Sequence, residues 1–227
     1  IFMRFKDPLL ESSRFTLYGV CKETKEGNWK KYALLSSPSL AGEIYGDRSC
    51  ALHKEATSEG IASKIREFTT TVHSLHSLDI AHQDIKLENI LVDQDEKGEL
   101  RFYLHNFAYA TKDKTTTVLC GAEHYRPMDD RISHVYDPKL KDLYSLGVLL
   151  FNLFTKKMWK DEQDEIPMEW KQHPLRHCVL IEEEYKRILD RHLGQIPRKM
   201  IPILGGFLRV YPFDRMRTRE AQAFLSK

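Results

Sequence analysis

One long stretch of the chain carries hydrophobic residues at helical spacing. They recur at steps of four, three, four and three residues: Ile61, Ile65, Phe68, Val72 and Leu75. This spacing places them on one face of an α-helix of about five turns, and Thr57 or Ser58 has a side chain suited to cap its N-terminus. The pattern therefore predicts an amphipathic helix that begins at residue 57 or 58.

Short β-prone runs flank polar turns in two other places. Residues 15–20 and 31–36 are separated by the polar stretch 22–28, which predicts an antiparallel pair of strands. Residues 89–92 and 100–104 enclose a second polar loop that ends in glycine, which predicts a hairpin. The long helix separates these two units along the chain.

The second half of the chain has a helical pattern. Its longest apolar stretch, residues 143–154, is about 12 residues long and includes Ser145 and Asn152, whereas a membrane span needs roughly 20 apolar residues. We therefore expect a buried helix over residues 142–155 and no membrane span. After about Glu182 the pattern predicts short helices separated by Gly and Pro.

The amino-acid composition indicates which cellular compartment and which classes of partner to expect. The 227 residues are 41% hydrophobic, enough for a sizeable core, and the net charge of +2 gives no whole-surface attraction for nucleic acid or anionic membrane. The four cysteines lie too far apart for a zinc knuckle and are too few for a disulfide framework: Cys21, Cys50, Cys120 and Cys178. We interpret them as reduced thiols in a cytoplasmic compartment. The first residues contain no signal peptide, and an upstream targeting signal stays open.

The residues that carry chemistry lie between the long helix and the second hairpin. His82, Asp84, Lys86 and Asn89 follow one another in the stretch 80–92. Their order and spacing resemble the catalytic loop of protein kinases, and the Lys two residues after the Asp is the serine/threonine-kinase form.

Four further stretches resemble other kinase segments in the expected order: 104–110 the metal-binding segment, 121–128 the end of the activation segment, 142–147 the start of the central helix, and 211–215 the late Asp-Pro-x-x-Arg. The resemblance implies an α+β, protein-kinase-like fold. It also implies two parts: a reduced, β-rich small lobe with the hinge over residues 1–39, and a mainly α-helical large lobe over residues 40–227.

The resemblance assigns roles to four residues. Asp84 would orient the attacking hydroxyl and accept its proton, and Lys86 would neutralise charge on the transferred phosphoryl group. Asn89 would hold one metal ion, and Asn106 stands where the family has the aspartate for the second metal ion. Because Mg²⁺ favours carboxylates over neutral amides, we expect ATP and Mg²⁺ to bind weakly at these cofactor and metal positions.

Other kinase features are altered or absent in the sequence. No Gly-x-Gly-x-x-Gly occurs, and Leu35 stands where the resemblance places the nucleotide-binding lysine. Residues 14–21 and 31–36 resemble the fourth and fifth strands of the small lobe, so the preceding strands are not in this sequence. A fragment of a longer protein, a sequence with residues left out and a naturally truncated protein remain alternatives. Gln83 replaces the arginine that would clamp a phosphorylated activation loop.

Three residues are expected to act structurally. Asp142 would hold the backbone of the catalytic loop from beneath, and His82 would serve mainly in packing. Arg215 is expected to pair with Asp129 or Asp130, in place of the ion pair that a kinase makes with its late arginine.

These features predict a pseudokinase that regulates or inhibits a protein partner, such as a genuine kinase, by binding it. The alternative is an atypical active serine/threonine kinase whose phosphate loop and lysine lie upstream. A kinase-fold enzyme that transfers another group, such as a nucleotidyl unit, needs residues that we do not find. The predicted docking surface includes Phe2, Phe5 and Phe15, which either the opening segment Ile1–Leu10 or another chain would cover.

Overall fold

The computed structural model describes these parts of the chain: residues 2–4, 16–23, 29–36, 58–94, 100–104, 106–128 and 135–225. Several expectations fall outside the described residues. They concern the lobe boundary near residue 39, the side chains of the proposed docking surface, and the acidic partners of Arg215: Phe2, Phe5, Phe15, Asp129 and Asp130. These expectations stay predictions.

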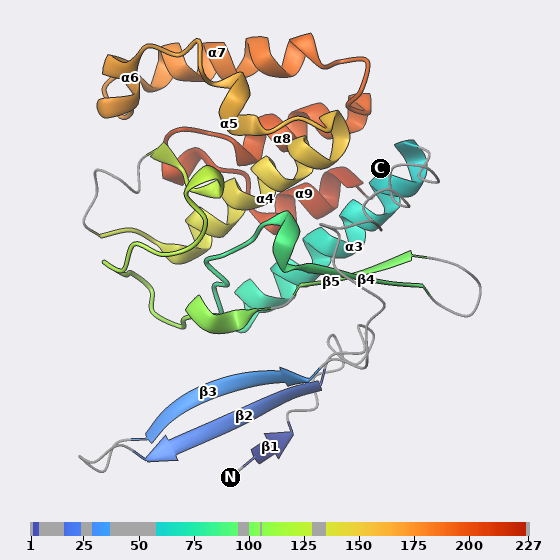
Figure 1. The fold of residues 1–227 in the computed structure, drawn as a ribbon, viewed down its shortest axis with the longest axis vertical. Helices are drawn as coiled ribbons and strands as arrows, with labels where there is room; N and C mark the ends of the chain where they lie inside the picture. The colour runs from blue at the N-terminus through green and yellow to red at the C-terminus, as the bar shows by residue number, and fades with distance from the viewer. Residues whose placement is uncertain are drawn as a thin grey trace.

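The first strands form a three-stranded antiparallel sheet in the order β1-β2-β3 (Figure 1). The predicted pair is present as β2 (Thr16–Glu23) and β3 (Trp29–Ser36). β2 continues into the stretch expected to be a turn, because its last residues still pair with β3 and so satisfy their backbone groups. β1 (Phe2–Arg4), which the sequence pattern did not predict, pairs with the other side of β2.

The predicted amphipathic helix and second hairpin are confirmed. Helix α3 (Ser58–Ser77) buries the side chains of its apolar stripe: Ile65, Phe68, Val72 and Leu75. It packs against β5 (Leu100–Leu104), which pairs in antiparallel fashion with β4 (Ile90–Gln94). The catalytic-loop stretch therefore runs from the end of α3 to the start of β4.

Helix α4 (Pro138–Thr155) is the predicted buried helix, and it begins four residues earlier than expected. The Asp137 side chain accepts a hydrogen bond from Lys139 N at 2.8 Å, and Pro138 occupies the first helical turn, where its missing N–H costs nothing. This cap starts the helix ahead of Asp142. Lys156, in the left-handed conformation, ends it.

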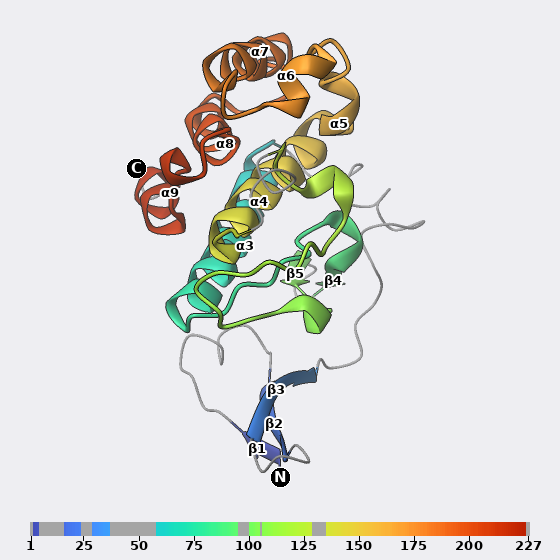
Figure 2. The same cartoon turned by 90° about the vertical axis from the view of Figure 1, so that its left-hand side faces the viewer.

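The remaining helices follow α4 in the chain and complete the helical part of the structure (Figures 1 and 2). They are α5 (Trp159–Glu162), α6 (Met168–Gln172), α7 (Cys178–Arg191), α8 (Ile201–Phe207) and α9 (Thr218–Leu225). The expectation of only short helices after Glu182 is wrong for α7, which spans 14 residues. Its buried positions keep a helical period through that point: Ile181, Tyr185, Ile188 and Leu189.

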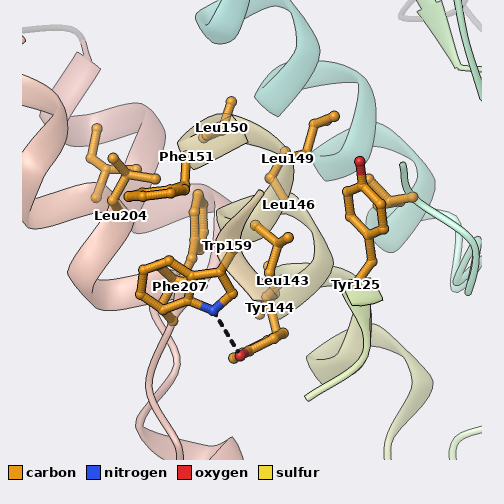
Figure 3. Close-up of a cluster of buried hydrophobic side chains, with 14 of the residues drawn as sticks. Tyr125, Leu143, Tyr144, Leu146, Leu149, Leu150, Phe151, Trp159, Leu204 and Phe207 are labelled. Atoms are coloured by element: carbon orange, nitrogen blue, oxygen red, sulfur yellow. Dashed lines mark hydrogen bonds between the residues drawn. The ribbon is translucent and has the colours of Figure 1, made fainter. Parts of the chain in front are cut away.

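The core lies around α4, and aromatic side chains fill much of it (Figure 3). Trp159 is fully buried, and its Nε1 donates a hydrogen bond to Tyr144 OH at 3.1 Å. Tyr144 OH lies 3.1 Å from Tyr185 OH, so the buried polar ends of these rings satisfy one another. Among the described helices, none is both long and apolar enough to cross a membrane.

Candidate active site

The backbone of the catalytic loop is fixed from below by one carboxylate. Asp142 Oδ2 accepts a hydrogen bond from His82 N and Oδ1 accepts one from Gln83 N, each at 2.7 Å. His76 Nε2 lies 3.0 Å from the same Oδ2. Asp142 is 1% exposed, so its two oxygens are directed at the loop instead of water. The expected structural role of Asp142 is confirmed.

His82 is a packing residue, as expected. Its side chain is fully buried, and its Nδ1 accepts a hydrogen bond from Asp84 N at 3.2 Å. The ring meets Phe107 edge-on, with 4.7 Å between the ring centroids. His82 thus joins the catalytic loop to the short helix η2 (Phe107–Tyr109), which follows Asn106.

The carboxylate of Asp84 is held by three donors. Its Oδ1 accepts a hydrogen bond from Ala122 N at 2.9 Å. Its Oδ2 accepts one from Asn89 Nδ2 at 2.7 Å and lies 3.2 Å from Lys86 Nζ. Asp84 is 4% exposed and Lys86 is partly exposed, so the lysine extends toward solvent from a buried acid. Asp84, Lys86 and Asn89 therefore form one cluster.

Asn106 joins this cluster through an amide–amide hydrogen bond. Asn106 Nδ2 donates to Asn89 Oδ1 at 3.2 Å, and Asn89 Nδ2 in turn donates to Asp84 at both its backbone oxygen and its carboxylate. Asn106 has a left-handed backbone (φ 64°), a conformation in which asparagine is enriched. The structure thus brings all four predicted site residues together.

The side chains at the two positions expected to hold metal ions are both amides, and they bond each other. The side-chain oxygen of Asn89 already accepts a hydrogen bond from Asn106, which presents its amide nitrogen to it. Asn106 lacks the negative charge that an aspartate at its position would offer to a hard divalent cation, whereas Asn89 is the residue type that kinases use at its position. Among the described residues, no group of three or more His, Cys, Asp or Glu side chains is placed to hold a metal ion.

The stretch 121–128, which resembles the end of a kinase activation segment, requires a glycine at its first position. Gly121 has a φ of 78°, and a Cβ atom there would lie 2.2 Å from the backbone oxygen of Gln83 and 3.3 Å from Asp84 Oδ1. Only glycine allows this close approach without strain. The approach places the next N–H, that of Ala122, against the Asp84 carboxylate.

Sequence reasoning missed a buried cation behind this segment. Lys141 is 2% exposed, and its Nζ donates to Cys120 O and lies 3.7 Å from Cys120 Sγ. It also lies 5.4 Å from the centroid of the Tyr136 ring. A signal was present, because Lys141 precedes the buried Tyr144 and Ser145 by three and four residues, which places it on the same face of α4.

Arg215 has a buried place in the structure. The side chain is 2% exposed and donates hydrogen bonds to the backbone oxygens of Arg209, Leu140 and Val210 at 2.9–3.2 Å. Its guanidinium lies 5.2 Å from the ring centroid of Tyr144. The predicted ion pair with Asp129 or Asp130 stays a prediction, because both partners lie outside the described residues.

A buried acid that is held by lysine and asparagine, on a loop between a helix and a hairpin, is the arrangement of a protein kinase catalytic loop. The protein kinase domain family matches this chain over residues 19–224. The chain belongs to this family, and the expected kinase-like fold is thereby confirmed; the described part from residue 58 is mainly helical. Domains of this family generally bind ATP and Mg²⁺.

The chain is similar to serine/threonine kinases from several organisms. It is 31% identical over 150 residues to the putative serine/threonine-protein kinase YPL150W of Saccharomyces cerevisiae, a match that covers 65% of this chain and 16% of that protein. It is 34% identical over 124 residues to serine/threonine-protein kinase kin-29 of Caenorhabditis briggsae, covering 54% and 15%. Serine/threonine-protein kinase SRK2C of Arabidopsis thaliana is 26% identical over 187 residues, covering 75% and 52%. The chain thus spans less than two thirds of the length of these relatives.

Proposed function

We propose that this protein is a pseudokinase, a kinase-fold protein that acts by binding a protein partner. The observation that carries the proposal is the hydrogen bond of 3.2 Å between Asn106 Nδ2 and Asn89 Oδ1. Asn89 is the residue type that kinases use to hold one metal ion, but Asn106 replaces the aspartate that holds the other, and its amide bonds the side-chain oxygen of Asn89. A weakly bound metal ion would therefore neutralise little of the negative charge on the ATP phosphates. The proposed function accordingly includes no phosphoryl transfer.

Nucleotide binding tests this proposal directly. We expect the melting temperature of the wild-type protein to change little with ATP and to be indifferent to Mg²⁺. A ligand at 100 times its Kd adds about 2.7 kcal/mol to the free energy of unfolding, so a large rise that requires Mg²⁺ would overturn the proposal.

Two substitutions at one position test the reason for weak metal binding. Asn106→Asp adds the missing negative charge, so we expect it to give a larger Mg²⁺-dependent shift with ATP than the wild type gives. Asn106→Ala is the matched control, because it removes the amide pair without adding charge. Equal shifts for the Asp and Ala variants would show that charge at position 106 is not what limits metal binding.

The second candidate is an active serine/threonine kinase, which the cluster of Asp84, Lys86 and Asn89 favours. A radiolabel assay with ATP and a generic protein substrate separates the two candidates. We propose that incorporation by the wild type stays at background, equal to that of Asp84→Asn. Incorporation that disappears in Asp84→Asn and persists in the control Asp161→Asn, at an exposed site, would replace the pseudokinase proposal with the kinase.

The partner proposed here is a protein, such as a genuine kinase. Large exposed hydrophobic side chains support a binding role: Val118, Leu119, Val135, Met168, Val179 and Phe213. The free thiols of Cys120 and Cys178 suit the reducing, cytoplasmic compartment that we propose for it.

The opening segment, Ile1–Leu10, carries two phenylalanines of the proposed docking surface, Phe2 and Phe5. Light scattering and a pull-down from cell extract compare the wild type with a Phe2→Asp/Phe5→Asp double variant. We expect the double variant to lose a specific kinase partner. Monomeric behaviour and the same kinase-free set of captured proteins for both would rule out docking through this segment.

A further inference from the structure

One buried amide joins an early part and a later part of the activation segment, residues 106–128. Gln83 Nε2 donates a hydrogen bond to Tyr109 O at 2.8 Å, near the start of the segment. Gln83 Oε1 accepts from Cys120 Sγ at 3.4 Å, later in the segment, and lies 3.1 Å from the OH of Tyr136, which follows the segment. Gln83 is 4% exposed, so these bonds form away from water, where an unpaired polar group is costly.

The backbone of Gln83, from which the side-chain amide extends, is itself held in place. Gln83 has a left-handed backbone (φ 66°), and its N–H is bound to Asp142 Oδ1 at 2.7 Å. Its backbone oxygen leaves no room for a Cβ atom at position 121. The side-chain amide therefore extends from a fixed point in the catalytic loop, and the segment is anchored to that point.

Further contacts hold the late part of the segment in the same place. Thr116 and Tyr136 exchange two backbone hydrogen bonds of 3.0 and 3.1 Å. The single hydroxyl proton of Tyr136 is shared between Gln83 Oε1 and Val118 O, and Lys141 Nζ donates to Cys120 O. The three groups that bond the Gln83 amide are neutral, and the cation that contacts Cys120 and Tyr136 is the chain's own buried Lys141, so the anchoring needs no added phosphate charge.

We propose that Gln83 is a positioning residue that keeps the activation segment ordered without phosphorylation. The amide performs by neutral hydrogen bonds what a charged clamp would perform only after a phosphate is attached. Thr115 and Thr117 are exposed near the anchored part, and a negative charge on them would meet no cation at Gln83. This inference concerns the order of the segment and goes beyond the proposed function.

Hydrogen–deuterium exchange of the protein alone tests the inference. Gln83→Glu replaces the Nε2 donor with an oxygen that faces Tyr109 O, and Gln172→Glu makes the same chemical change at an exposed site on α6. We expect exchange of the described amides from 107 to 121 to rise about tenfold in Gln83→Glu. Exchange in α4 should stay unchanged, and Gln172→Glu should match the wild type. Equal exchange in Gln83→Glu and wild type would overturn the inference.

A phosphate mimic tests independence from charge. Thr115→Glu/Thr117→Glu should leave exchange over the same amides within about twofold of the wild type, because the neutral anchor already holds the segment. A strong increase in protection in this variant would show that the segment is ordered by charge and would overturn the inference.

A second variant keeps the test decisive if Gln83→Glu does not fold. Tyr136→Phe removes the hydroxyl that lies between Gln83 Oε1 and Val118 O. We expect faster exchange from 116 to 120 alone, and unchanged exchange there would contradict the anchor. Neither nucleotide nor partner is needed, so the result is independent of the proposed function.

Discussion

Asp142 and Asp84 are both buried, and their different hydrogen-bond partners give the same side chain different roles. The oxygens of Asp142 bind backbone N–H groups of the catalytic loop, so this carboxylate acts as part of the scaffold. The oxygens of Asp84 accept from a backbone N–H and from the side chains of Asn89 and Lys86, at the edge where Lys86 reaches solvent. The first aspartate is therefore best tested through stability.

Asp142→Ala should lower the free energy of unfolding by about 3 kcal/mol, because it leaves two buried N–H groups without an acceptor. Urea denaturation measures the change, with Asp161→Ala at an exposed position as the control. A loss equal to that of the control would show that the loop finds other acceptors.

Glu162 links α5 to α7 through charge. Its carboxylate lies 3.0 Å from His192 Nε2 and 3.3 Å from Lys157 Nζ. Partial burial alone would raise the pKa of Glu162, but the hydrogen bonds and charges of His192 and Lys157 outweigh it, so its pKa lies below the ordinary value of 4.5. The ionised form is thus favoured in the folded state.

A lowered pKa in the folded state gives stability that is present above the unfolded pKa and is lost as the pH falls through the folded pKa. Glu162→Gln should therefore lower stability at pH 7, and the difference from wild type should shrink below about pH 4.5. Urea denaturation across this range, with the exposed Glu169→Gln as control, measures it. A difference that stays constant with pH would contradict the role of charge.

At the scale of elements, the close contact of α4 with α8 depends on a glycine. A Cβ atom at Gly147 would lie 2.9 Å from Phe207 Cβ and 3.0 Å from two side-chain atoms of Leu208. These atoms belong to well-packed core residues, which have little space to shift. The two helices approach as closely as they do because position 147 carries no side chain.

Gly147→Ala should lower the free energy of unfolding by about 1–3 kcal/mol, because overpacking outweighs the better helix propensity of alanine. Gly194→Ala is the matched control, since a Cβ atom there meets nothing within 4 Å. Thermal denaturation compares the two variants. Equal melting temperatures would show that α8 moves aside without cost.

At the scale of the molecule, the described buried hydrophobic residues form one cluster that extends from Ile65 in α3 to Leu225 in α9. Elements far apart in sequence share this core, and α3 and α9 pack against each other. A single core favours a single cooperative unfolding transition.

We expect far-UV circular dichroism of the helices and fluorescence of Trp159 to give the same midpoint in urea. The fluorescence is read in a variant with Trp29 and Trp170 changed to Phe, so that only Trp159 reports. Adding Phe207→Ala should shift both midpoints together, with a loss of about 3–5 kcal/mol. Two separate midpoints would mean that the core divides.

Elements whose signals are local could be predicted from the order of residues alone. The period of Ile65, Phe68, Val72 and Leu75 predicted α3, because neighbours three and four residues apart share a helix face. Two β-prone runs around a polar loop that ends in glycine predicted the β4–β5 hairpin. The order of Asp84, Lys86 and Asn89 identified the catalytic loop, because their spacing lies within one short segment.

Contacts between residues far apart in the sequence became visible only in the folded chain. Asn106 meets Asn89 across 17 positions and Tyr136 meets Gln83 across 53, separations at which no periodic signal survives. The burial of Lys141 and the neutral anchor at Gln83 depend on how the activation segment packs over the catalytic loop. These contacts form between residues that lie far apart in the sequence. The order of residues therefore identifies candidate site residues but does not predict which of them contact each other.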